Sequence, residues 1–193
     1  ATWKYKLNYA VKSTNSSSDF SATAQAASIP QLSWPCSARG INLDFEADWS
    51  DYTSITSCKN LEWKHTGIDI NASSGNDVYA AEAGTVKKTG SGGNWKYYMT
   101  IEHKDSQGNK YTTVYWHIDA NLKVSVGNSV TRGQKIAVVA DMGSKTHLHF
   151  GIRNAPYYYP VSIRGGLPTT RCNALTKYEI WDANFINPRN YLP

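Results

Sequence analysis

Four of the five histidines in this chain lie in three short clusters of residues that can bind a metal or transfer a proton. The clusters are His65-Thr66-Gly67-Ile68-Asp69, Tyr115-Trp116-His117 and His147-Leu148-His149-Phe150. Histidine is the commonest metal ligand, and carboxylates also bind zinc. Chance does not readily group so few histidines, so the three clusters together predict one metal site.

Strand geometry would bring these side chains together, because residues two apart in a β-strand project to the same side. The pairs His147/His149 and Tyr115/His117 each share a face by this rule. The spacing of four residues in the first cluster also allows projection to one side. We therefore expect six side chains to converge on one groove: His65, Asp69, Tyr115, His117, His147 and His149.

The chemistry of such a group is that of a catalytic zinc site, which has three protein ligands and one open position. Two histidines and one aspartate leave residual positive charge on the metal, which lowers the pKa of bound water to about 7 and polarises a carbonyl. Two histidines are then left for proton transfer and oxyanion stabilisation. His103 lies outside the clusters, at a strand end before a turn, and we expect it to be structural.

The elements that must position the clusters are short strands. Alternating or apolar segments separated by glycine-containing turns predict strands at 78–81, 85–88, 97–103, 111–117, 135–140 and 147–153. Helical periodicity is missing throughout this stretch. The pattern predicts a mainly β fold: an antiparallel, sandwich-like sheet core with a narrow groove, long loops and little helix.

The length of 193 residues fits one domain with an extension. Residues 1–33 are interpreted as an N-terminal extension, with one strand over 3–11 and a connector rich in Ser, Ala and Thr, and residues 34–193 as the catalytic body. No apolar run reaches the roughly 20 residues of a membrane-spanning helix. A start without Met and a β-rich composition favour a secreted, mature chain.

The net charge of +5 favours binding to anionic surfaces such as bacterial cell walls, and solubility explains it equally well. No arginine-rich run or nucleic-acid motif is present, so no nucleic-acid partner is expected. The three cysteines, Cys36, Cys58 and Cys172, predict one disulfide and one free thiol. We favour a pairing of Cys36 with Cys58, while Cys172 could take either partner.

The order HxGxD, YxH, HLHF resembles that of the M23 family of zinc metallopeptidases, the lysostaphin-type or LytM-type endopeptidases. Residues 78–86 are similar to the alanine-rich lead of that family into a Gly-x-Val strand. Residues 126–136 resemble its VGxxVxxGQxI segment, and residues 187–192 resemble its Pro-x-x-Leu ending. The resemblance covers roughly residues 61–153 and the last few.

The resemblance implies that His65, Asp69 and His149 are the ligands of a Zn²⁺ ion. It makes His147 the general base that takes a proton from zinc-bound water, with His117 opposite, hydrogen-bonding the water or the oxyanion. Two departures stand out. Thr146 replaces a common proline and is expected to loosen the strand entry, and no tyrosine occurs over 57–64, where relatives place one (Tyr52 is the nearest upstream).

The resemblance further implies a secreted, monomeric metalloendopeptidase that hydrolyses glycine-containing bonds, most often in peptidoglycan. A narrow groove suits glycine because the missing Cβ lets the backbone approach the metal. Degradation of glycine-rich proteins such as elastin is the alternative within enzymes. From another class, the alternative is a non-catalytic LytM-like module that binds the cell wall or activates another enzyme; the five filled positions argue against it.

Overall fold

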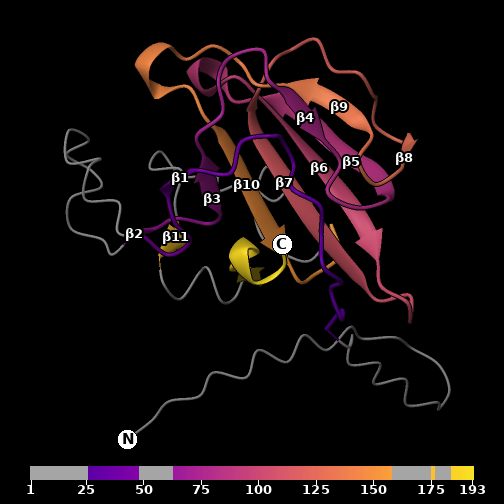
Figure 1. Ribbon diagram of the computed structural model, residues 1–193. Helices are drawn as coiled ribbons and strands as arrows, with labels where there is room; N and C mark the ends of the chain where they lie inside the picture. Colours follow the sequence, from indigo (N-terminus) through magenta and orange to yellow (C-terminus); the bar gives the residue numbers. More distant parts are fainter. Residues whose placement is uncertain (1–25, 48–62, 158–174, 177–183) are drawn as a thin grey trace, which may run out of the picture.

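The computed structural model describes residues 26–47, 63–157, 175–176 and 184–193. Their main element is an antiparallel eight-stranded sheet (Figure 1). Its path runs through β1 (Ile41–Leu43), β3 (Ile68–Ile70), β10 (Leu148–Arg153), β7 (Lys110–Ile118), β6 (Tyr97–Lys104), β5 (Gly84–Ser91) and β8 (Ser129–Val130), while β12 (Phe185–Ile186) pairs with β10.

Two smaller antiparallel pairs complete the strands, β4 (Asp77–Tyr79) with β9 (Lys135–Val138) and β2 (Trp63–Lys64) with β11 (Leu175–Thr176). Val78 of β4 and Ile136 of β9 share one buried apolar cluster with Met99 and Tyr115 of the main sheet. The β4–β9 pair therefore forms a second layer over one face of the sheet.

Helix is scarce in the described residues. It is limited to three short 3₁₀ helices, η3 (Gly93–Trp95), η4 (Gly143–Lys145) and η5 (Pro188–Asn190). The predicted fold class, mainly antiparallel β with little helix, is confirmed. None of the helices in the described ranges has the length and apolar character needed to cross a bilayer.

Strand β7 shows how the sheet divides into two faces. Tyr111 and Tyr115 are fully buried in the large apolar cluster, whereas Val114 and Trp116 belong to a separate buried cluster with Tyr98. The alternation of a strand produces this division, since neighbouring side chains point to opposite faces. The face that carries Trp116 is the one on which the histidine clusters meet.

The six strands expected from the sequence are all present, with ends that differ by a few residues. The expected strands at 85–88, 111–117 and 147–153 correspond to β5, β7 and β10, for example. The turn expected after His103 is also present, at residues 105–109. Asp105 organises it by accepting hydrogen bonds from the backbone N–H groups of Gln107 and Asn109, at 2.9 and 2.8 Å.

Both ends of the described chain pack on the sheet. Leu32 is fully buried, and its N–H donates to the carbonyl of Tyr191 at 2.7 Å. Tyr191 and Leu192 pack against the large apolar cluster. The strand predicted over 3–11 lies outside the described residues.

The disulfide that we favoured is not found, because Cys36 is a buried free thiol. Its Sγ donates to the carbonyl of Ala38 at 3.7 Å, so the sulfur is turned toward its own loop. Burial also raises the pKa of this thiol. Cys58 and Cys172 lie outside the described residues.

Candidate metal centre

Three buried side chains from the first and third clusters form a compact triangle of donor atoms. His65 Nε2 lies 2.9 Å from His149 Nδ1, and Asp69 Oδ1 lies 3.1 Å from the former and 3.0 Å from the latter. All three residues are buried. Among the described residues, these are the ones that could hold a metal ion.

Sheet register accounts for two of the three donors. Asp69 in β3 and Trp116 in β7 are both paired with His149 in β10, one on each side. Three adjacent strands therefore present these side chains in one row on one face. His65 reaches the row from the segment just before β3.

A backbone carbonyl orients the His65 ring. His65 Nδ1 lies 2.9 Å from the carbonyl oxygen of Asp44, which can only accept a hydrogen bond. The Nδ1 atom therefore carries the proton, and the Nε2 lone pair points at the centre of the triangle. Such outer contacts commonly fix the tautomer of a metal-binding histidine.

The donor set fits a zinc ion. Bonds of 2.0–2.2 Å in a tetrahedral site put ligand atoms roughly 3.3 Å or slightly more apart, so a few tenths of an ångström separate the observed triangle from a liganded one. Two imidazole nitrogens and one carboxylate oxygen, with a fourth position left open, also match the composition of catalytic zinc sites.

The charge state of the triangle suits a cation. Burial alone would raise the pKa of Asp69, but its close contacts with the rings of His149 and His65 outweigh burial and hold the pKa well below its usual range. Burial is also the largest influence on His149 and lowers its pKa. An ionised aspartate and a neutral histidine are the forms that bind metal.

Gly67, the glycine of the HxGxD cluster, permits the close approach of β10. A Cβ at this position would lie 2.3 Å from the carbonyl oxygen of Phe150 and 3.0 Å from His149 Nε2. Any larger residue would push β10 away from the segment that carries His65. The glycine is therefore part of the geometry of the centre.

His117 and His147 lie beside the triangle and face each other, with ring centroids 4.4 Å apart. His147 Nε2 is 3.4 Å from Asp69 Oδ2. Each ring is held through Nδ1 by a backbone carbonyl, His117 by that of Trp95 at 3.0 Å and His147 by that of Lys145 at 2.7 Å. Both Nδ1 atoms are thus donors, and both Nε2 atoms are left as the basic atoms.

Burial dominates the electrostatics of His117. Together with the nearby rings of His147 and His149, it lowers the pKa of His117 to about 3. The ring is therefore neutral at physiological pH. His117 also stacks on Trp116, with centroids 5.2 Å apart and an angle of 12° between the planes.

One expectation about this group is wrong, because Tyr115 does not share a face with His117. The Tyr115 hydroxyl accepts a hydrogen bond from the N–H of Ala81 at 2.8 Å, and burial raises its pKa to about 12. His117 has a φ of 66°, in the left-handed region. That dihedral breaks the alternation of β7 and turns His117 onto the face of Trp116. The other five predicted residues do come together.

The effect expected of Thr146 is also not observed. Its hydroxyl accepts from the N–H of Met142 at 2.9 Å and donates to the carbonyl of Gly143 at 2.8 Å. These bonds fasten Thr146 to η4, so the entry to β10 is held rather than loosened. Of the positions at which relatives place a tyrosine, 57–64, residues 57–62 lie outside the described residues, as does Tyr52.

His103 is structural, as expected. Its Nδ1 donates to the carbonyl of Ala83 at 2.8 Å, and its Nε2 lies 2.7 Å from the hydroxyl of Thr113. Burial lowers its pKa to about 4. The ring stacks on Tyr111, with centroids 4.9 Å apart, inside the core.

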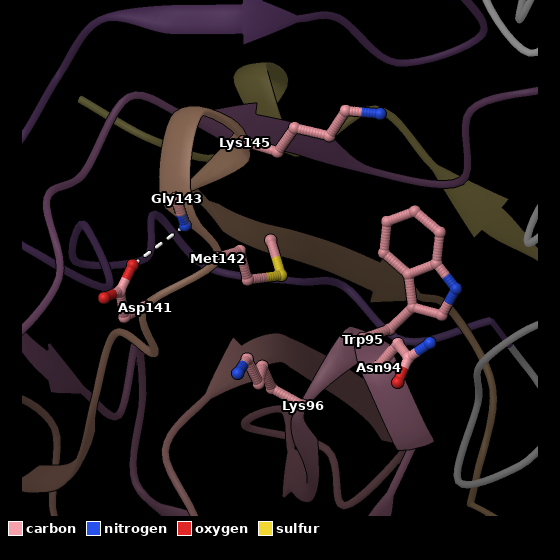
Figure 2. A pocket seen from close by; sticks show the side chains of 7 residues that line it. All are labelled: Asn94, Trp95, Lys96, Asp141, Met142, Gly143 and Lys145. Atoms are coloured by element: carbon pink, nitrogen blue, oxygen red, sulfur yellow. Dashed lines mark hydrogen bonds between the residues drawn. The ribbon is translucent and has the colours of Figure 1, made fainter.

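A pocket of about 520 Å³ adjoins the two outer histidines. It is lined by residues 94–96 around η3 on one side and by residues of the 141–145 segment around η4 on the other (Figure 2). Trp95 and Lys145, whose carbonyls hold the two histidines, both belong to this lining. The sequence did not indicate Trp95 and Lys145, because the group that holds each histidine is a main-chain carbonyl, which every residue has.

Known proteins are similar to this chain in sequence and in fold. The chain is 39% identical over 99 residues to the peptidoglycan DD-endopeptidase ShyB of Vibrio cholerae, covering 48% of this chain and 21% of that protein. It is 38% identical over 90 residues to an uncharacterised metalloprotease of Haemophilus influenzae, covering 45% of this chain and 18% of the relative. The chain thus spans about a fifth of the length of these two relatives.

A solved structure agrees with these matches. The crystal structure of a zinc-containing peptidase from Vibrio cholerae superposes with a TM-score of 0.51 at 27% identity, covering 69% of this chain and 39% of the other. The model of peptidase family M23 matches residues 63–160, about half of the 193 residues. This chain therefore belongs to peptidase family M23.

Proposed function

We propose that this chain is a secreted zinc endopeptidase that hydrolyses peptide bonds in bacterial peptidoglycan, glycine-containing bonds among them. One observation carries the proposal. Three metal-binding side chains, His65, Asp69 and His149, converge within about 3 Å of one another beside two histidines that are oriented by backbone carbonyls. Membership of peptidase family M23 supports the same reaction class.

The zinc ion, when bound by His65, Asp69 and His149, would supply a Lewis acid that polarises the scissile carbonyl and lowers the pKa of water. His147 suits the role of general base because its Nδ1–H is donated to Lys145, which leaves Nε2 to accept a proton. The resulting cation would lie 3.4 Å from the carboxylate of Asp69, which stabilises it. The proton can then pass to the leaving amine.

His117 suits a different task. Its Nδ1–H is donated to the carbonyl of Trp95, so the Nε2 atom of the neutral ring is an acceptor. An acceptor can orient the attacking water, whereas an oxyanion needs a donor. Of the two roles that family resemblance allows, the hydrogen bond therefore supports positioning of the water.

The substrate assignment rests on chemistry and on relatives. The relative ShyB is a peptidoglycan DD-endopeptidase, and the net charge of +5 of this chain favours an anionic wall. Elastin is the alternative substrate because it is also rich in glycine, which lets a backbone approach the metal closely.

The deciding experiment is digestion of three purified substrates: peptidoglycan with glycine bridges, peptidoglycan with direct cross-links, and elastin. We expect new amino termini from peptidoglycan, abolished by a zinc chelator and restored by added zinc. The His147→Ala protein serves as the inactive control. Release from elastin alone would establish the alternative substrate. No release by protein that contains stoichiometric zinc would indicate a non-catalytic module.

A further inference from the structure

The pocket between η3 and η4 carries more positive than negative charge. Two lysines, Lys96 and Lys145, and one aspartate, Asp141, belong to its lining. Asp141 Oδ1 already accepts a hydrogen bond from the N–H of Gly143 at 2.8 Å (Figure 2). Neither lysine forms an ion pair with any residue in the described ranges. The pocket lining therefore carries a net positive charge.

The rest of the pocket is partly apolar. Figure 2 shows the Met142 side chain between Lys145 on one side and Lys96 on the other, with the indole of Trp95 beside it. Methionine adapts to irregular groups and packs well against apolar stems. A short side chain with an anionic end matches this combination of an apolar wall and cationic edges.

The position of the pocket ties it to the reaction. Trp95 and Lys145 contribute to its walls, and their carbonyls hold His117 and His147. Because its walls adjoin these two histidines, a group bound in the pocket would belong to a substrate residue close to the scissile bond.

The backbone at Lys96 adds a separate observation. Its φ of 64° and ψ of −150° place it in a region that is almost confined to glycine. Strained conformations of this kind cluster at functional sites, where the strained residue is held for a purpose. Here the strained residue is one of the two lysines of the pocket lining.

We propose that this pocket is a subsite for a substrate residue that carries a free carboxylate beside the scissile amide, and that Lys96 and Lys145 determine this preference. The inference rests on the proposed peptidase function. It predicts that cross-links made directly between stem peptides, with a free carboxylate near the bond, are better substrates than uncharged glycine bridges.

The test uses two synthetic cross-linked stem peptides that differ only in having a carboxylate or a carboxamide beside the cross-linking bond. We expect the wild-type zinc enzyme to favour the carboxylate form about tenfold in kcat/KM, the ratio given by about 1.4 kcal/mol of added interaction. Lys96→Gln and Lys145→Gln should each bring that ratio close to one. The preference should also shrink as salt is added, because salt screens exposed charges.

The matched control is Lys88→Gln, which removes an exposed lysine of β5 outside the pocket and should keep the wild-type ratio. Equal kcat/KM for the two peptides in the wild type, or a ratio unchanged in both pocket variants, would overturn the subsite. Kd values measured by calorimetry for the same two peptides test whether the pocket prefers the carboxylate, and this test does not depend on cleavage. Binding that discriminates between the peptides without any cleavage would contradict the proposed function and leave the subsite standing.

Discussion

His147 and His149 are two positions apart, yet their surroundings differ, and we propose different tasks for them. His149 Nδ1 lies within 3.0 Å of Asp69 and is almost inaccessible, with 7% of its side chain exposed, whereas 17% of the His147 side chain is exposed. We expect His149→Ala to lose both zinc and activity. His147→Ala should keep zinc and lose turnover by about 100-fold or more, as expected for a general base.

Metal content after dialysis, measured beside activity, checks this pair of variants. His103→Ala is the control for removing an imidazole elsewhere, because His103 lies outside the centre and should leave the zinc content unchanged. Stoichiometric zinc in His149→Ala would show that our ligand assignment is wrong.

The left-handed backbone of His117 leads to a prediction about stability. Glycine adopts positive φ readily, whereas other residues are strained there by about 1 kcal/mol or more. His117→Gly and His117→Ala both remove the imidazole and its bond to Trp95. We therefore expect the glycine variant to be about 1 kcal/mol more stable than the alanine variant in urea unfolding. Equal stabilities, or a more stable alanine variant, would mean that the φ of this residue is not strained.

The same residue shows where sequence reasoning about the site reached its limit. Residue types and spacing predicted the five side chains that come together, and the register of β3, β7 and β10 places Asp69 and His149 in one row. Alternation also predicted that Tyr115 would join them, which is wrong, because a single left-handed residue reverses the direction of His117. The side chains alone do not encode that dihedral.

At the scale of elements, the packing of β10 on the segment before β3 depends on Gly67. An alanine Cβ there would lie 2.3 Å from the Phe150 carbonyl oxygen, a contact that only a shift of the backbone can relieve. We expect Gly67→Ala to lower the unfolding free energy by about 3 kcal/mol, the upper part of the range for overpacking. The same shift should weaken zinc binding, since His149 moves with β10.

Gly40 offers a matched control next to β1. A Cβ at Gly40 would lie 3.6 Å from the Cβ of Asn71, an ordinary contact. Gly40→Ala should therefore change stability by no more than about 0.5 kcal/mol. Comparable losses in the two variants, measured by urea unfolding and zinc titration, would argue against a specific role for Gly67.

Six strands were predictable because an alternating or apolar pattern extends over four or more residues. The two- and three-residue strands β1, β2, β3, β8, β11 and β12 were not predicted. The 3₁₀ helices η3 and η4 were not predictable, since each has only three residues and no periodicity. The pairing of β4 with β9 could not be predicted either, because it joins residues some sixty positions apart in the chain. The parts of the site that depend on these elements, the pocket and the carbonyls of Trp95 and Lys145, were missed for the same reason.

At the scale of the whole molecule, His103 links stability to pH. Burial lowers its pKa from 6.5 to about 4. The unfolded chain therefore binds a proton near pH 6.5, whereas the folded chain does so only near pH 4. The stability that depends on neutral His103 is complete above pH 6.5 and is lost as the pH falls toward 4.

Unfolding free energies measured at pH 7 and pH 4.5 test this linkage. Over that interval the wild type should lose about 2 kcal/mol more than His103→Gln, which has no titrating ring. The comparison with the variant removes the contributions of the other histidines. Identical pH slopes for the two proteins would show that His103 is not held neutral.

The hydrogen bonds that orient His117 and His147 come from the main chain, and this has a consequence for how such an enzyme can diversify. A carbonyl acceptor persists through substitution of its own side chain, so positions 95 and 145 can change without removing the acceptors. The same two positions line the pocket. Single mutations in the pocket wall can therefore change its shape and charge without removing the acceptors that orient His117 and His147.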